Sequence, residues 1–289
     1  MLNPTDLVIC GFDDSGQARM AAFWAADWCD RLGCQLRLMA VTGTVGTASR
    51  DTGRGRLTPA EQQGPRTAEA LAALRAELAR DHPELSIDSA VLRGLPADQL
   101  LEASRAGAVV VIGTRGLGPA LSGLLGGVAE EVLSNASGPV VVVPSTLTQP
   151  TEHVVTLGID PEGPSLAALR FALDIAERLR VGLRVVAAVE AGESAERAGL
   201  QLDDVVASVI DAHADLPIDQ QVIRGRPHEV LARAAAGTEL LVVGSRGRGG
   251  LAGRLLGSTS RKVVREARVA TAVVRRPRKV SEPPGTAAT

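Results

Sequence analysis

The stretch LLVVGSRGRGGLAGRLLGSTSRKVV, residues 240–264, has a counterpart in VVVIGTRGLGPALSGLLGGVAEEVL, residues 109–133. Each begins with a short apolar run that leads directly into glycines, and Gly244 follows Gly113 by 131 positions. The same separation relates Arg-Gly at 93–94 to Arg-Gly at 224–225. A separation that is kept over such a length indicates an internal repeat, so the chain contains two copies of one unit.

The amino-terminal parts of the two copies also match, but at a different separation. CGFDDSGQARMAAFWA begins at Cys10, and LGIDPEGPSLAALRFA begins 147 positions later, at Leu157. The first copy therefore holds 16 extra residues, which we place in the stretch 42–65, rich in Gly, Thr and Arg. We expect a mobile loop there, which either closes over a site or is an insertion tolerated at the surface.

Composition argues against several classes of protein. The net charge is −2, only 2% of the 289 residues are aromatic, and there is no tyrosine, so we expect no nucleic-acid binding. No apolar run reaches the roughly 18 residues of a membrane span, and the first residues lack a signal-peptide pattern, so we expect no membrane partner and a cytoplasmic location. Cys10, Cys29 and Cys34 are odd in number and show no CxxC spacing, which favours buried free thiols over redox chemistry.

In both copies, short apolar runs alternate with alanine-rich helical patterns. Such alternation predicts an α/β fold in which right-handed crossovers join parallel strands, with helices on both faces. We expect a domain at 1–147, a second domain at 148–280 and a disordered tail at 281–289, with a linker at 144–151. The predicted strands are 7–11, 35–41, 87–92, 109–112 and 140–143 in the first copy, and 154–158, 183–189, 218–223, 240–243 and 271–274 in the second.

Polar residues and glycines follow the strands at the edge where open parallel sheets bind ligands, at the carboxyl ends. Glycine lets backbone amides approach a phosphate, and a helix that begins there offers unpaired amides and the positive end of its dipole. An aspartate at the end of the first strand could accept hydrogen bonds from ribose hydroxyls or help to hold a metal ion. Four such residues recur in the two copies, as the pairs Asp13 and Asp160, Gly113 and Gly244, Gly116 and Gly247, and Gly126 and Gly257.

Taken alone, a glycine loop after a strand is a weak signal, more often a plain turn than a phosphate site. Its recurrence in register with an aspartate makes a binding role much more plausible. The glycines follow the fourth strand and no GKS or GKT occurs, so this is neither a Rossmann fingerprint nor a Walker loop.

The spacing Gly, two residues, Gly, nine residues, Gly, then Ser resembles the ATP-binding motif of the universal stress protein family. Gly244, Gly247, Gly257 and Ser258 match that motif in full. The resemblance extends over residues 6–144 and 151–276. It implies two open five-stranded parallel sheets of strand order 3-2-1-4-5, which pair through their last strands about a pseudo-twofold axis. A homodimer is a further possibility.

The same resemblance implies that ATP, with or without Mg²⁺, lies across the ends of the first and fourth strands. Adenine would meet the backbone of the residue that ends the second strand. The implied site residues are Gly158, Asp160, Val189, Val243, Gly244, Gly247, Gly257, Ser258 and Thr259 in the second copy, and Gly11, Asp13, Val41, Ile112, Gly113, Gly116 and Gly126 in the first.

The two copies differ at this motif. Gly127 occupies the position of Ser258, so the first copy lacks the hydroxyl. The formal charge is −1 over residues 113–133 and +5 over residues 244–264. Because a triphosphate is strongly anionic, we expect the second copy to bind ATP better. The alternative is that these helix charges point into solvent.

The leading hypothesis is an ATP-binding regulatory protein that reports nucleotide state to unknown protein partners. One alternative is an interaction module that binds no nucleotide. Another is an enzyme of a related nucleotide-dependent type, but HxGH and SGGxDS signatures are absent from the sequence and no nucleophile–base pair is evident. We therefore expect no catalytic residues and no dedicated metal site, while slow ATP hydrolysis stays open.

Overall fold

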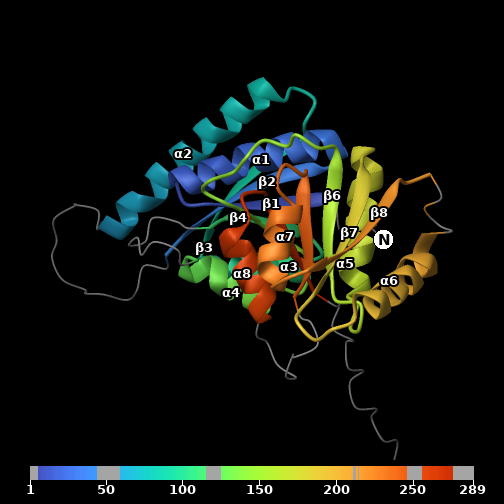
Figure 1. Cartoon of the computed structure of the whole chain (residues 1–289). Helices are drawn as coiled ribbons and strands as arrows, with labels where there is room; N and C mark the ends of the chain where they lie inside the picture. Colours follow the sequence, from blue (N-terminus) through green and yellow to red (C-terminus); the bar gives the residue numbers. More distant parts are fainter. Residues whose placement is uncertain are drawn as a thin grey trace, which may run out of the picture.

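The computed structural model describes residues 6–43, 59–114, 125–210, 213, 215–245 and 256–275, and structural statements below concern these residues. Ten strands and eight helices are assigned in them, alternating along each half (Figure 1). The first half contains β1 (Leu7–Phe12), α1 (Gly16–Leu32), β2 (Gln35–Thr42), α2 (Pro59–Asp81), β3 (Ile87–Arg93), α3 (Pro96–Arg105), β4 (Val109–Gly113), α4 (Gly127–Asn135) and β5 (Val140–Val143). The second contains β6 (Val154–Ile159), α5 (Leu166–Leu179), β7 (Gly182–Val189), α6 (Ala195–Ile210), β8 (Ile218–Arg224), α7 (Pro227–Ala234), β9 (Leu240–Gly244), α8 (Ser258–Glu266) and β10 (Thr271–Val274).

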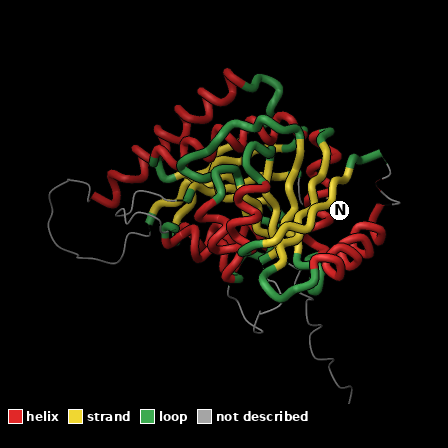
Figure 2. The backbone as a smooth tube through the Cα atoms, viewed as in Figure 1, coloured by secondary structure: helices red, strands yellow, loops and turns green. Residues whose placement is uncertain are grey.

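All ten strands belong to one sheet, with the order β3-β2-β1-β4-β5-β10-β9-β6-β7-β8. Within each half the neighbours are parallel and follow the predicted order 3-2-1-4-5. The halves join where β5 pairs antiparallel with β10, with Val141 opposite Ala272. The predicted pairing through the last strands is thus confirmed, and it makes the two five-stranded sheets one twisted band (Figure 2).

Helices cover both faces of the sheet, as predicted. One apolar core lies under α1, α2, α5 and α6, and a second lies under α3, α4, α7 and α8, which gather together in Figure 1. Strand β1 shows how the alternation of a strand serves both cores, because Val8 and Cys10 face the first and Ile9 faces the second. Buried Ala, Val and Leu make up most of both cores, as the low aromatic content requires.

The first helix of each half begins at a serine. The Ser15 hydroxyl accepts a hydrogen bond from the Ala18 amide, and Ser165 does the same for the amide of Ala168. Asp14 has a left-handed backbone with φ of 64°, and the capping contact comes from Ser15 alone.

One helix boundary differs from the sequence expectation. The stretch 42–65 was expected to be a loop, yet α2 already begins at Pro59. Proline suits a first helical turn, and the Ala-Glu-Gln-Gln run that follows favours helix, so the Gly64-Pro65 pair misled the sequence interpretation. Residues 44–58 lie outside the described residues.

Charged side chains also join the halves. Arg31 at the end of α1 makes two hydrogen bonds, of 2.7 and 3.0 Å, to the Glu239 carboxylate just before β9. Its counterpart in the repeat, Arg178, donates to the Leu32 carbonyl at 2.8 Å and lies 3.7 Å from Asp6. Within the described part of the chain, no helix is both long and apolar enough to cross a bilayer.

Candidate functional site

The candidate site of the second half lies at the carboxyl ends of β6 and β9. These strands are neighbours, with Gly158 opposite Val243, so Asp160 and Gly244 emerge at the same edge of the sheet. Helix α8 begins at Ser258, and the amide of Gly257, just before it, donates to the Ser245 carbonyl at 2.9 Å. This bond brings the start of α8 to the end of β9.

The start of α8 has the properties of an anion-binding helix end. Gly257 is the N-cap residue, and no side chain of a described residue caps the helix. The amides of the first three helical residues, Ser258 to Ser260, have no acceptor within the helix, and among the described residues no backbone carbonyl accepts from them. Ser258 is exposed, and its hydroxyl makes no hydrogen bond to a described residue. An anion could therefore bind amides, hydroxyl and dipole together.

The first half repeats this frame but not its side chains. The Gly126 amide donates to the Thr114 carbonyl at 2.9 Å, and α4 begins without a side-chain cap. In the second half, buried Ser260 donates from its hydroxyl to the Gly244 carbonyl at 2.7 Å. The equivalent residue in the first half is Ala129, which cannot make that bond. The helix start is therefore tied to its strand more firmly in the second half, a difference that the sequence analysis missed.

Both strand-end aspartates order their own loops. One oxygen of Asp13 accepts from the amide of Ser15 at 3.1 Å and from its hydroxyl at 2.6 Å. The corresponding oxygen of Asp160 accepts from the Glu162 amide at 3.2 Å. The two carboxylates thus stand at the predicted edge, and each is held in place by donors from the loop that follows its strand.

Three of the predicted site glycines have packing partners. A Cβ at Gly158 would lie 2.7 Å from two side-chain carbons of Leu231 in α7, whereas a Cβ at Gly11 would meet Leu100 at 3.4 Å. A Cβ at Gly113 would come within 3.1 Å of the backbone carbonyl oxygen of Gln17 in α1. Close approach of helices to the sheet is therefore one physical reason for glycine at these positions.

The residues predicted to meet adenine need one correction. Val189 ends β7 and accepts the Gly225 amide at 3.0 Å. The matching bond in the first half, from Gly94 at 3.0 Å, goes to Thr42. Strand β2 thus ends one residue later than predicted, and Thr42, rather than Val41, is the counterpart of Val189.

The other predicted site residues are partly buried and partly outside the described residues. Ile112 and Val243 are buried in the core, so a ligand would meet their backbone at most. Thr259 is the second residue of α8 and is half-buried. Gly116 and Gly247 lie outside the described residues.

Some of the charges that distinguish the two copies pair with each other between the halves. Arg261 in α8 forms an ion pair of 3.3 Å with Glu130 in α4, and both side chains are half-exposed. These two charges therefore meet across the halves instead of pointing separately into solvent. Lys262 is exposed. Arg246, Arg248 and Arg254 lie outside the described residues.

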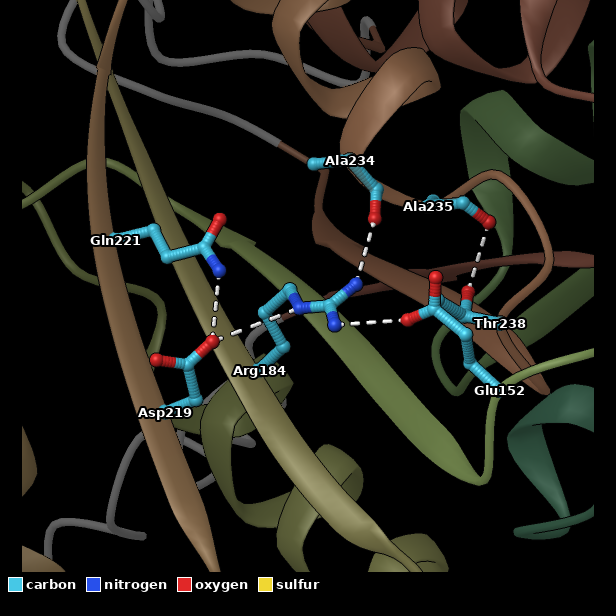
Figure 3. A network of polar contacts seen from close by, with 7 residues as sticks. All are labelled: Glu152, Arg184, Asp219, Gln221, Ala234, Ala235 and Thr238. Carbon is cyan, nitrogen blue, oxygen red and sulfur yellow. Dashed lines mark hydrogen bonds and ion pairs between the residues drawn. The ribbon is translucent and has the colours of Figure 1, made fainter.

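A separate polar cluster lies near the amino ends of β7 and β8, away from the candidate site (Figure 3). There Arg184 reaches Glu152, which follows the linker, at 2.8 Å and Asp219 of β8 at 3.6 Å. Among the described residues, the first half has the cross-strand part, an ion pair of 2.9 Å between Arg37 and Asp88. The repeat separations of 147 and 131 relate these two pairs, so the sequence contained a signal for them. The position of the cluster indicates a structural role.

Comparison with known proteins adds an independent result. The model of the family described as "Universal stress protein family" matches residues 5–144 and again 153–275. A universal stress protein of Mycobacterium tuberculosis is 34% identical over 206 residues, covering 66% of this chain and 70% of its own. One of Mycolicibacterium smegmatis is 30% identical over 284 residues, covering 93% and 96%. A solved universal stress protein from Archaeoglobus fulgidus, 22% identical, covers 94% of this chain and 99% of its own, with a TM-score of 0.67.

Proposed function

Because the chain belongs to the universal stress protein family, we propose that it is a regulatory protein of the stress response that binds ATP in its second half. The observation that carries this proposal is the start of α8. There an exposed serine hydroxyl and three helix amides that lack an intrahelical acceptor lie at the same sheet edge as Asp160 and Gly244.

The chemistry of this edge suits a nucleoside triphosphate. Amides at a helix start and a hydroxyl donate hydrogen bonds to phosphate oxygens, and the helix dipole favours their negative charge. The Asp160 carboxylate accepts hydrogen bonds, as ribose hydroxyls require, and it could help to hold Mg²⁺ on the phosphates. The carbonyl of Val189 is already bonded to Gly225, so we propose that adenine packs against this strand end without using that oxygen.

The first half offers a weaker version of the same edge. It lacks the hydroxyl of Ser258 and the bond made by Ser260, and Glu131 adds negative charge near the start of α4. We propose that the first half mainly supplies the surface against which the second half packs. We assign no catalytic residue in either half.

Substituting aspartate for Ser258 tests the proposal in the full chain. A carboxylate at the first helical position stabilises a helix through the dipole, so the variant should fold, but it would repel a phosphate bound to the same amides. We expect isothermal titration with ATP to show binding for the native chain and at least tenfold weaker binding for Ser258→Asp.

The matched control is Gly127→Asp, which places the same charge at the equivalent position of α4. Its ATP affinity should stay within about twofold of the native value. The proposal fails if the native chain shows no ATP binding, or if Ser258→Asp binds ATP as the native chain does while its circular dichroism is unchanged.

A further inference from the structure

The turn between α1 and β2 places two cysteines side by side. Gly33 has φ of 64° and donates from its amide to the Asp30 carbonyl at 3.3 Å, and the Cys34 amide donates to the Cys29 carbonyl at 3.0 Å. This pair of bonds defines a Schellman motif, in which the outer bond draws its two residues together and their side chains commonly touch. In this turn those side chains are the thiols of Cys29 and Cys34.

The second half contains the same motif without the thiols. Arg180, with φ of 55°, donates to the Glu177 carbonyl at 3.0 Å, and Val181 donates to the Ala176 carbonyl at 2.9 Å. Ala176 and Val181 thus hold the positions of Cys29 and Cys34. Since an apolar pair is sufficient for packing at this turn, the two thiols of the first half bring a chemistry that the fold itself does not require.

The surroundings make the two thiols unequal. Cys34 is 6% exposed and Cys29 is fully buried. The interaction with the Cys29 thiol lowers the pKa of Cys34, and the nearby Arg178 guanidinium lowers it further, while burial and Asp6 oppose the shift. The Cys34 thiol and burial raise the pKa of Cys29. Cys34 is thus the better nucleophile and Cys29 lies within its reach.

The third cysteine has the properties of an inert core thiol. Cys10 lies in the middle of β1 and has no exposed surface. Burial raises the pKa of its thiol to about 12. Cys10 therefore serves as an unreactive control for the other two cysteines of the same half.

We propose that Cys29 and Cys34 form an oxidisable dithiol that closes to a disulfide across the end of α1, with hydrogen peroxide or an alkyl hydroperoxide as the oxidant. The Cys34 thiolate attacks one peroxide oxygen, the O–O bond breaks, and a sulfenic acid forms while the other oxygen leaves as hydroxide or alkoxide. That anion takes up from solvent the proton that the Cys34 thiol had released, and becomes water or alcohol. The Cys29 sulfur then attacks the sulfenic sulfur, an S–S bond forms, the S–O bond breaks, and the hydroxyl leaves as water with the thiol proton. The two sulfurs together lose two electrons, which the peroxide gains.

The position of this dithiol connects it to the contact between the halves. Arg178, which lies near Cys34, donates to the carbonyl of Leu32 in the same turn and pairs with Asp6. A disulfide formed here replaces the thiolate that this guanidinium faces. The dithiol therefore acts next to an interaction that joins the second half to the first.

The test exposes the full chain to hydrogen peroxide, quenches it, blocks free thiols under denaturing conditions and maps peptides by mass spectrometry. We expect a peptide pair joined through Cys29 and Cys34, lighter by two hydrogen atoms, that reverts with dithiothreitol, while Cys10 is recovered as the blocked thiol. Recovery of all three cysteines as blocked thiols would overturn the proposal. So would a sulfinic acid on Cys34, or a disulfide between two chains, in place of the internal bond.

Variants that copy residues of the second half supply the controls. Cys29→Ala and Cys34→Val recreate the Ala176 and Val181 pair, so both should fold, and neither should form the internal disulfide. Cys10→Ala should form it as readily as the native chain. If Cys10→Ala loses the disulfide while remaining folded, Cys10 takes part in the chemistry and the assignment is wrong.

Discussion

The two halves share one topology and one set of loop-closing bonds, yet they differ at the start of the last helix. Both bonds, from Gly126 to Thr114 and from Gly257 to Ser245, are 2.9 Å long. Around them, Gly127 and Ala129 stand in one half where Ser258 and Ser260 stand in the other. The comparison teaches that packing preserves the frame of both copies, while a hydroxyl that can donate to an anion, that of Ser258, stands in one copy and is replaced by Gly127 in the other.

The contacts between the halves are likewise unequal. Arg31 and Arg178 are equivalent in the repeat, but only Arg31 meets a buried carboxylate, Glu239, whose side chain is 5% exposed. The position equivalent to Glu239 is Ala108, so Arg178 bonds a carbonyl and a half-exposed aspartate instead. Comparing the stability lost on replacing each arginine therefore measures what the buried carboxylate adds to the contact.

The largest effect on stability is expected from Arg31→Met, which keeps much of the side-chain volume but leaves the Glu239 carboxylate without its guanidinium. Breaking a fully buried ion pair costs about 3–5 kcal/mol, and because the Arg31 side chain is 44% exposed we expect about 1–3 kcal/mol. Urea unfolding measures this loss.

Arg178→Met is the matched comparison. It removes a hydrogen bond to the Leu32 carbonyl and a longer ion pair, for which we expect about 0.5–1.5 kcal/mol. If Arg178→Met lowered the free energy of unfolding as much as Arg31→Met or more, the buried Glu239 carboxylate would not make the Arg31 contact the stronger one.

An effect smaller than that of Arg31→Met is expected at the glycines of the first strands. A Cβ at Gly158 meets the tightly packed Leu231 side chain at 2.7 Å, so Gly158→Ala should cost about 1–2 kcal/mol through overpacking. Gly11→Ala meets Leu100 at an ordinary contact distance of 3.4 Å and should change stability by less than about 0.5 kcal/mol. Thermal unfolding of the two variants checks the difference, and equal melting temperatures would contradict it.

The smallest effect is expected from the ion pair between Arg261 and Glu130. Both partners are half-exposed, so a double-mutant cycle with Arg261→Ala and Glu130→Ala should yield a coupling of about 0.2–1 kcal/mol that falls as salt is added. A coupling that does not respond to salt would argue against an ionic contact across the halves.

Much of the fold could be predicted because its signals are local or repeated. Apolar runs mark the strands, and the repeat of residues 109–133 at 240–264 revealed the two copies. The order 3-2-1-4-5 and the pairing of the last strands came with the family resemblance, and the structure has both. Strand ends were less certain, because the bond from Gly94 to Thr42 depends on the neighbouring strand and not on the run of residues around Val41.

The candidate site was less predictable where contacts come from distant segments. Nothing local to Ser260 indicates that its hydroxyl reaches the carbonyl of Gly244. The count of charges likewise could not show that Arg261 and Glu130 meet across the halves. Periodicity and spacing locate an edge of the sheet, whereas the partners of each side chain at that edge depend on how the elements pack.

Nucleotide stoichiometry tests the inequality of the two halves most directly. Equilibrium dialysis of the full chain against radiolabelled ATP, over free concentrations that span the dissociation constant of the native chain, gives both the number of bound nucleotides per chain and their affinity. We predict one tight site per chain, at least tenfold weaker in Ser258→Asp and kept in Gly127→Asp. Two sites of equal affinity, or one site that survives Ser258→Asp and disappears in Gly127→Asp, would contradict the account.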